Sequence, residues 1–138
     1  MLLALLAVSA TASAVEAPKP AVKADAAKGA TLYADGDAAR GLPACVSCHG
    51  AAGNSTITVN PKLAGQHSEY LLKQLRNFKS QDGKPAERVN GIMGGMVAAL
   101  SDDDMKGLAA HFASQQLKPE SAKNKASIEL GQRLWRAG

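Results

Sequence analysis

Cys45-Val46-Ser47-Cys48-His49-Gly50 is the stretch of this 138-residue sequence that decides its fold. It contains the two cysteines of the chain, separated by two residues, and a histidine follows the second one at once. Two thiols at this spacing can add to the two vinyl groups of one porphyrin, while the adjacent imidazole reaches the iron from the same side. The stretch therefore predicts a covalently attached haem, with thioether links at Cys45 and Cys48 and with His49 as an axial iron ligand.

Two other chemistries use closely spaced cysteines, and the rest of the chain suits both poorly. A dithiol redox site normally lies at a helix start within a βαβ pattern, which this sequence lacks. A zinc site needs four ligands, and beyond the motif only His67 and His111 remain, neither in a second close pair. Two cysteines are also too few for a disulfide scaffold. Haem attachment uses all three residues of the motif.

A haem iron held by His49 has a sixth position, which is either open to small ligands or filled by a second side chain. Met105 is expected in the core, His67 at a helix start, and His111 in side-chain packing. Met93 and Met96 differ from these, because they lie in the segment GIMGGM, whose glycines let a loop backbone approach a flat cofactor closely. A thioether from this loop is the predicted sixth ligand.

Apolar spacing on both sides of the motif predicts helices, and no strand pattern of any length occurs. Helices are expected over residues 25–36, 68–82 and 101–116. Ser68 is the expected N-cap of the second helix, and Ser101 with Asp104 is the expected capping box of the third. The glycine-rich stretch after the motif is expected to be mostly loop. The fold class is therefore all-α with long loops.

Composition indicates one small domain with a thin protein core. Hydrophobic residues make up 46% of the chain but aromatic residues only 4%, so we expect a bound group to fill part of the centre. The chain has 16 basic and 12 acidic residues, a net charge of +4 that is spread along its length. Nucleic-acid binding is not expected from a charge distributed in this way.

Residues 1–14 are expected to be a signal peptide. Leu2 to Val8 are apolar, and Ala12-Ser13-Ala14 has the small residues of a cleavage site. The apolar run is far shorter than the ~20 residues that a membrane-spanning helix needs. We therefore expect export to the periplasm and at most peripheral membrane association. Residues 15–24, with two prolines among Ala and Lys, predict a disordered leader.

A short repeat relates the two ends of the chain. Residues 29–36 (GATLYADG) and 131–138 (GQRLWRAG) share the pattern G-x-x-L-aromatic-x-x-G and lie 102 positions apart, the length of one small domain. We therefore expect residues 25–117 to form one haem domain, and residues 118–138 to be a linker and the first helix of a truncated second domain. The alternative is a terminal helix that caps the first domain.

Four further segments follow the motif in a fixed order along the chain and are specific sequence signals. They are Gly53-Asn54-Ser55, Pro61-Lys62-Leu63-Ala64-Gly65-Gln66, Tyr70-Leu71-Leu72-Lys73-Gln74-Leu75, and the stretch from Met93-Gly94-Gly95-Met96 through Leu100-Ser101-Asp102-Asp103-Asp104-Met105. Together with the motif they make the chain resemble the class I cytochromes c, and among these the cytochrome c4 type. The resemblance implies the class I cytochrome c fold, a few short helices and long loops wrapped around one covalently bound haem c.

The same resemblance implies roles for particular residues. Met93 would be the second axial ligand and Met96 a packing residue. The carbonyl of Pro61 would accept a hydrogen bond from the nitrogen of His49 that faces away from the iron, which fixes the orientation and tautomer of the ring.

It also implies that the helix with Gly29 and Tyr33 crosses the helix with Leu108 and Phe112. His111 lies at a packing position of that crossing where the family tends to have tyrosine.

The function implied is one-electron transfer rather than enzymatic catalysis. The resemblance names a quinol–cytochrome c reductase as the expected electron donor, a terminal oxidase as the expected acceptor, and a second haem domain in the full-length chain. Two alternatives remain open: a haem enzyme or gas-binding module with a labile sixth ligand, and the haem domain of a larger dehydrogenase or oxidase assembly.

Overall fold

The computed structural model describes residues 24–81, 83–122 and 124–137. Within them the chain forms helices and loops with two isolated β-bridges and no strand. The α-helices are α1 (Ala26–Asp35), α2 (Val46–His49), α3 (Ser68–Phe78), α4 (Gly91–Ala98), α5 (Asp102–Ala113) and α6 (Ile128–Ala137), and the 3-10 turns are η1 (Ala38–Arg40), η2 (Ala51–Gly53) and η3 (Lys125–Ser127). The expected all-α fold class is confirmed. The expected signal peptide, residues 1–14, and residues 15–23 of the expected leader lie outside the described residues.

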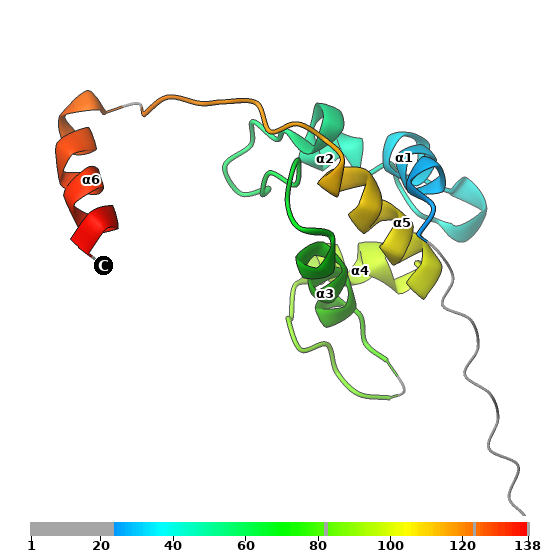
Figure 1. Cartoon of the computed structure of the whole chain (residues 1–138). Helices are drawn as coiled ribbons and strands as arrows, with labels where there is room; N and C mark the ends of the chain where they lie inside the picture. Colours follow the sequence, from blue (N-terminus) through cyan, green and yellow to red (C-terminus); the bar gives the residue numbers. More distant parts are fainter. Residues whose placement is uncertain (1–23, 82, 123, 138) are drawn as a thin grey trace, which may run out of the picture.

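Helices α1 and α5 cross at two glycines (Figure 1). A Cβ atom added to Gly29 would lie 2.1 Å from the carbonyl oxygen of Gly107, so the two backbones touch where they cross. Tyr33 of α1 and Leu108 and Phe112 of α5 are buried beside this contact. The close contact requires glycine because any larger side chain would push the helices apart.

Helix α5 starts with the predicted capping box. The Ser101 hydroxyl accepts from the backbone N–H of Asp104 at 3.1 Å, and the Asp104 carboxylate accepts from the backbone N–H of Ser101 at 3.0 Å. The Asp104 side chain is 1% exposed and also pairs with Lys28 Nζ at 2.8 Å and with an Arg40 guanidinium nitrogen at 2.6 Å. One carboxylate therefore connects the start of α5 to α1 and to η1.

Two predicted helix ends are wrong, and contacts distant in sequence explain both. Helix α5 ends at Ala113 rather than near Gln116, because the backbone after it bonds to the side chain of Asn54. The carbonyl of Gln116 accepts from the Asn54 amide nitrogen at 3.0 Å, and the backbone N–H of Lys118 donates to Asn54 Oδ1 at 2.8 Å. Helix α3 ends at Phe78, before the predicted stop at Asp82-Gly83.

The end of α3 is set by the loop that follows it. The backbone of Lys79 is extended. The backbone N–H of Arg88 donates to the carbonyl of Asn77 at 2.8 Å, so a carbonyl of the last helical turn is already occupied by the loop. The guanidinium of Arg88 also lies 4.6 Å from the centre of the Phe78 ring. At the other end of α3, Ser68 is the first helical residue and His67 occupies the N-cap position, so the predicted cap is displaced by one residue.

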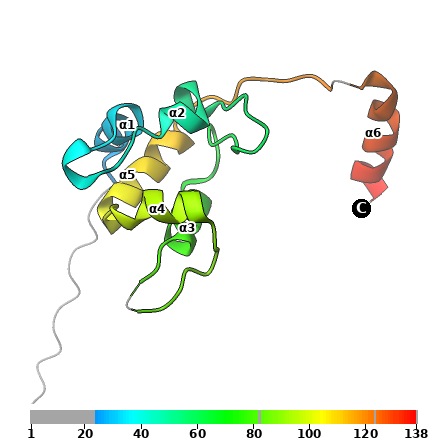
Figure 2. The same ribbon diagram turned by 180° about the vertical axis from the view of Figure 1, so that it is seen from behind.

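The segment GIMGGM is helical, whereas the sequence predicted a loop. The side chain of Asn90 accepts from the backbone N–H of Met93 at 2.9 Å and caps α4. This cap, together with packing beside α3, outweighs the poor helix propensity of three glycines. Figure 2 shows α4 next to α3 on the side of the molecule that it brings to the front.

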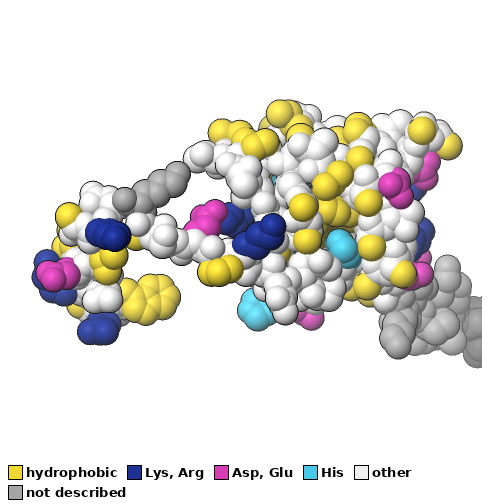
Figure 3. All heavy atoms as spheres, turned by 90° about the horizontal axis from the view of Figure 1, so that it is seen from above, with side chains coloured by type: hydrophobic (Ala, Val, Ile, Leu, Met, Phe, Trp, Pro, Cys, Tyr) yellow, Lys and Arg dark blue, Asp and Glu magenta, His cyan; other side chains and the backbone are white. Residues whose placement is uncertain are grey.

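Helix α6 lies apart from the other helices (Figure 1). None of its described residues is buried, and Leu130, Leu134 and Trp135 are 51%, 66% and 88% exposed. Hydrophobic and charged side chains both reach its surface in Figure 3. Among the described residues no helix combines the length and the apolar character that crossing a membrane would require.

Candidate functional site

The cysteine pair lies on the one-turn helix α2. Cys45 occupies the N-cap position, and its carbonyl accepts from the backbone N–H groups of Cys48 and His49 at 3.2 and 3.0 Å. This turn puts the two cysteines three positions apart, hence on one side of the helix. Cys45 is half-buried and burial raises the pKa of its thiol, while Cys48 is exposed. Cys45 and Cys48 are not joined in a disulfide.

His49 is buried, and its ring orientation is held by one hydrogen bond. Its Nδ1 lies 3.1 Å from the carbonyl oxygen of Pro61. Because a carbonyl can only accept, Nδ1 carries the hydrogen in this contact, which leaves Nε2 as the nitrogen available to bind a metal. That is the tautomer that binds a metal through Nε2 while a neighbouring oxygen fixes the ring.

Two side chains to which the sequence assigned no role hold the backbone of the motif. The carbonyl of Cys48 accepts from the Asn60 amide at 2.9 Å and from the Ser55 hydroxyl at 3.5 Å. Ser55 is buried at 3% exposure. The signal was present in the polar residues that follow the motif, but nothing local indicates that they bind its backbone.

Three of the candidates for the sixth position have different surroundings in the structure. Met105 is 1% exposed inside the core. His67 is exposed at the start of α3. His111 packs against the rings of Tyr33 and Phe112, and burial lowers the pKa of its imidazole.

Met93 and Met96 are both half-buried on α4 and pack against the core. They are three residues apart, so they share one face of that helix. The structure brings both to the edge of the core and does not by itself choose between them.

Seven partly buried apolar side chains pack against the core, and we call them the apolar band. Its members are Cys45, Val46, Leu63, Leu72, Leu75, Met93 and Met96. They come from α2, α3, α4 and the loop after η2. A large flat apolar group bound over these side chains would remove them from water. It would also add apolar volume to a core that has few aromatic residues. Figure 3 shows hydrophobic side chains exposed over one face of the domain.

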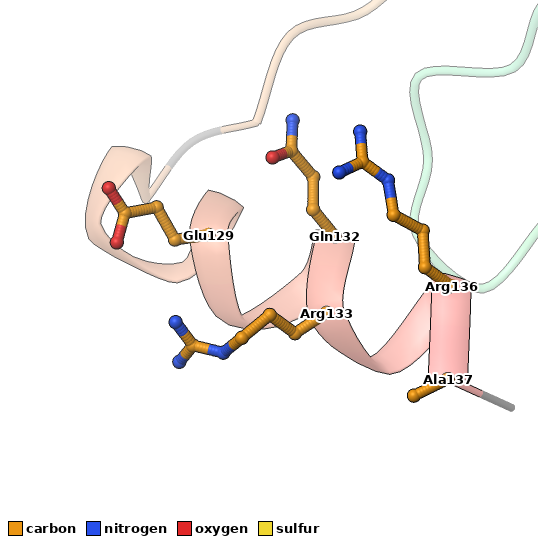
Figure 4. Close-up of a pocket in the computed structure, with 5 residues that line it drawn as sticks. All are labelled: Glu129, Gln132, Arg133, Arg136 and Ala137. Atoms are coloured by element: carbon orange, nitrogen blue, oxygen red, sulfur yellow. The ribbon is translucent and has the colours of Figure 1, made fainter.

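These residues fit a covalent haem. The donor set has two thiols on one helical turn, an imidazole with a free Nε2, and a thioether-bearing helix beside the same band. In the described part of the chain, no group of three or more His, Cys, Asp or Glu side chains is placed to hold a metal ion. The hollow drawn in Figure 4 is lined only by residues of α6, so it is the surface of one helix and not part of this site.

Comparison with known proteins agrees with the geometry. The family model for cytochrome c matches residues 26–116. Cytochrome c4 of Pseudomonas aeruginosa is 43% identical over 109 residues, which cover 77% of this chain and 51% of that protein. A thiosulfate dehydrogenase electron acceptor of Stutzerimonas stutzeri is 38% identical over 112 residues, covering 78% of this chain and 51% of that protein.

A solved cytochrome c4 of Acidithiobacillus ferrooxidans has a TM-score of 0.57 and 32% identity, over 64% of this chain and 49% of that one. The chain spans about half the length of the curated cytochrome c4 relatives that it matches. With its class I fold and its similarity to cytochrome c4, the chain belongs to the cytochrome c family, and its cofactor is haem c, for which Cys45, Cys48 and His49 form the attachment motif.

Proposed function

We propose that the protein is a periplasmic one-electron carrier of a respiratory chain and not an enzyme. The observation that carries this proposal is the buried His49 ring, whose Nδ1 is held by Pro61 beside two thiols on one helical turn. Bound haem supplies one-electron chemistry through two oxidation states of its iron. The protein supplies the covalent attachment at Cys45 and Cys48, the oriented imidazole, and an apolar band that excludes water.

Met93 is proposed as the second axial ligand, with Met96 as its packing neighbour. Support comes from the position of both on one face of α4 and from the resemblance of this segment to the ligand loop of the family. Methionine ligation and burial both favour the reduced iron and raise the reduction potential. An iron held from both sides has no position left for a substrate, which favours electron transfer over catalysis.

The electron donor and acceptor are proposed by chemical class. A quinol–cytochrome c reductase as donor and a terminal oxidase as acceptor suit a carrier with a raised potential. The relative described as a thiosulfate dehydrogenase electron acceptor adds a second kind of donor, a dehydrogenase of an inorganic sulfur compound. Both belong in a reconstituted assay, in which the preferred donor is the one that reduces the haem faster.

We also propose that residues 25–117 are one haem domain, that residues 1–14 are a signal peptide, and that residues 118–138 lead into a second haem domain. Support for the last point comes from α6, which repeats the pattern of α1 and leaves Leu130 and Leu134 exposed. A Cβ atom at Gly131 would meet nothing within 4 Å, whereas its counterpart Gly29 touches α5. Sequencing the gene beyond Gly138 tests this, because a second Cys-x-x-Cys-His is expected within about twenty residues.

The visible spectrum of the exported, matured protein tests the carrier proposal. The oxidised and reduced spectra are recorded before and after addition of carbon monoxide. A low-spin reduced spectrum that carbon monoxide does not change is the expected result, because both axial positions are filled. Rapid binding of carbon monoxide would instead favour the gas-binding or enzymatic alternative.

A further inference from the structure

The hydroxyl of Tyr33 bonds to both ends of the turn that follows His49. It donates to the carbonyl of Gly50, and it accepts from the backbone N–H of Gly53 at 3.1 Å. Tyr33 is 4% exposed, and burial raises the pKa of its hydroxyl, so it is protonated and able to donate. A buried hydroxyl with both a donor and an acceptor partner is fully used and costly to remove.

The same turn is hydrogen-bonded to the segment that carries Pro61. The carbonyl of Gly53 accepts from the backbone N–H groups of Leu63 and Ala64 at 2.8 and 3.2 Å. Gly53 has φ +75°, and a Cβ atom there would lie 3.0 Å from the Ala64 nitrogen, so glycine is what allows the two segments to come this close. Pro61, two residues before Leu63, accepts from Nδ1 of His49.

We propose that Tyr33 is a positioning residue for His49, and that its hydroxyl, not only its ring, holds the imidazole at the angle and in the tautomer needed for iron. The Nδ1–H···O bond depends on two backbone positions, His49 at one end and Pro61 at the other. The turn between Gly50 and Gly53 connects both. It is closed by a backbone hydrogen bond from the N–H of Gly53 to the carbonyl of Gly50 at 3.2 Å, and the Tyr33 hydroxyl reinforces it by bonding to both of these groups. The inference rests on the proposed function in one respect, that His49 binds the haem iron.

Packing alone would give Tyr33 a different signature. Its ring meets Phe112 edge to face with centroids 4.9 Å apart, and that contact contributes to the helix crossing whatever the hydroxyl does. Tyr33→Phe keeps the ring and removes only the hydroxyl, so it separates the two roles. The carbonyl of Gly50 and the N–H of Gly53 then each lose one partner and keep only their 3.2 Å hydrogen bond to each other.

The test compares the matured haem protein with its Tyr33→Phe variant. In the reduced, diamagnetic state, solvent exchange of the His49 Nδ1 hydrogen and of the Gly53 amide is followed by NMR, and the midpoint potential is measured at fixed pH. We expect both hydrogens to exchange at least about tenfold faster in the variant. We expect the midpoint potential to rise, because a weaker Nδ1–H···O bond makes the imidazole a poorer donor to oxidised iron.

Two variants are matched controls. Tyr70→Phe makes the same chemical change at a tyrosine that is 49% exposed, and we expect it to leave all three readouts unchanged. Leu32→Ala removes packing from a residue of α1 that is 5% exposed and retains the Tyr33 hydroxyl. It should lower global stability more than Tyr33→Phe does, yet leave the exchange of the His49 hydrogen within about twofold when measured far from unfolding.

Two results would overturn the inference. One is a Tyr33→Phe protein whose His49 exchange and potential match those of Tyr70→Phe. The other is a Leu32→Ala protein that changes these readouts as much as Tyr33→Phe, which would make the effect one of packing. Failure of the proposed function is seen separately, in the wild-type protein, as carbon monoxide binding or as haem that is not bound by His49.

Discussion

Met93 and Met96 present the clearest choice between two residues on one helix face. If Met93 closes the iron, Met93→Ala leaves the haem attached through Cys45 and Cys48 but opens the sixth position. We expect the reduced variant to bind carbon monoxide stoichiometrically and its midpoint potential to fall. The visible spectrum of the purified protein, titrated with carbon monoxide, measures the first effect directly.

Met96→Ala is the matched change on the same face of α4. Met96 is half-buried, so its truncation should cost about 1–2 kcal/mol of unfolding free energy and leave the carbon monoxide response absent. The reverse result, with carbon monoxide binding only in Met96→Ala, would assign the ligand to Met96 and shift the register of the segment by three residues.

Asp104 is a buried carboxylate with two cationic partners, Lys28 and Arg40. Burial alone would raise the pKa of its carboxyl, but hydrogen bonds from Lys28, Arg40 and Ser101 outweigh burial and hold that pKa well below its usual range. Asp104→Asn removes the charge while its two cationic partners remain. We expect a loss of about 2–3 kcal/mol at pH 7, measured by urea unfolding of the haem protein.

The same carboxylate makes stability depend on pH in acid. Because the pKa of Asp104 is lower in the folded than in the unfolded protein, its contribution is complete above the unfolded value of about 3.9 and is lost as pH falls below it. Asp104→Asn should therefore flatten the unfolding free energy between about pH 4 and pH 2. Asp37→Asn, at a partly exposed partner of Arg40, should leave most of that slope in place. An unchanged slope in Asp104→Asn would mean that other carboxyl groups govern acid unfolding.

At the scale of elements, the crossing of α1 and α5 allows no added atom. Gly29→Ala would place a methyl group 2.1 Å from the Gly107 carbonyl oxygen. The methyl carbon is fixed to the backbone of α1 and the oxygen belongs to the backbone of α5, so neither can rotate away. We expect a loss of about 3 kcal/mol or more, seen as a lower midpoint of thermal unfolding. Gly83→Ala serves as a comparison: its Cβ would meet nothing within 4 Å, and only its φ of +75° disfavours alanine.

Which elements could be predicted from the sequence depends on where their determinants lie. Helix α5 was predicted at its start because the Ser101–Asp104 capping box is contained in four consecutive residues. The three glycines of α4 favour a loop, and the Asn90 cap that outweighs them lies just before the segment. The end of α3 could not be predicted, since it depends on the bond from Arg88 to Asn77.

The same division applies to the candidate site as a whole. The attachment motif is six consecutive residues and could be recognised directly, while the contact between His49 and Pro61 followed only from resemblance to a family. The Tyr33 hydroxyl reaches Gly53 across 20 positions, and the aromatic pattern around Tyr33 indicates packing but not a hydrogen bond. Polar contacts between distant segments are the part of the site that single-sequence reasoning does not supply.

At the scale of the whole molecule, α6 has a glycine, Gly131, at the position that Gly29 has in α1, but no described helix packs against it as α5 packs against Gly29. If α6 begins a second haem domain, Gly131→Ala should have opposite effects in two contexts. In the present chain nothing lies within 4 Å of the added methyl group, so the substitution should stabilise α6 by about 0.5–1 kcal/mol, measured as slower amide exchange along the helix.

In a chain extended through the expected second domain, the same methyl group would enter a helix crossing like that of Gly29 and Gly107 and should cost that domain about 3 kcal/mol. Unfolding followed at the second haem reports this loss, and the first haem, read in the same experiment, is the internal control. A substitution that stabilises α6 in both chains would show that Gly131 faces solvent in each, and α6 would then be a terminal helix and not the counterpart of α1.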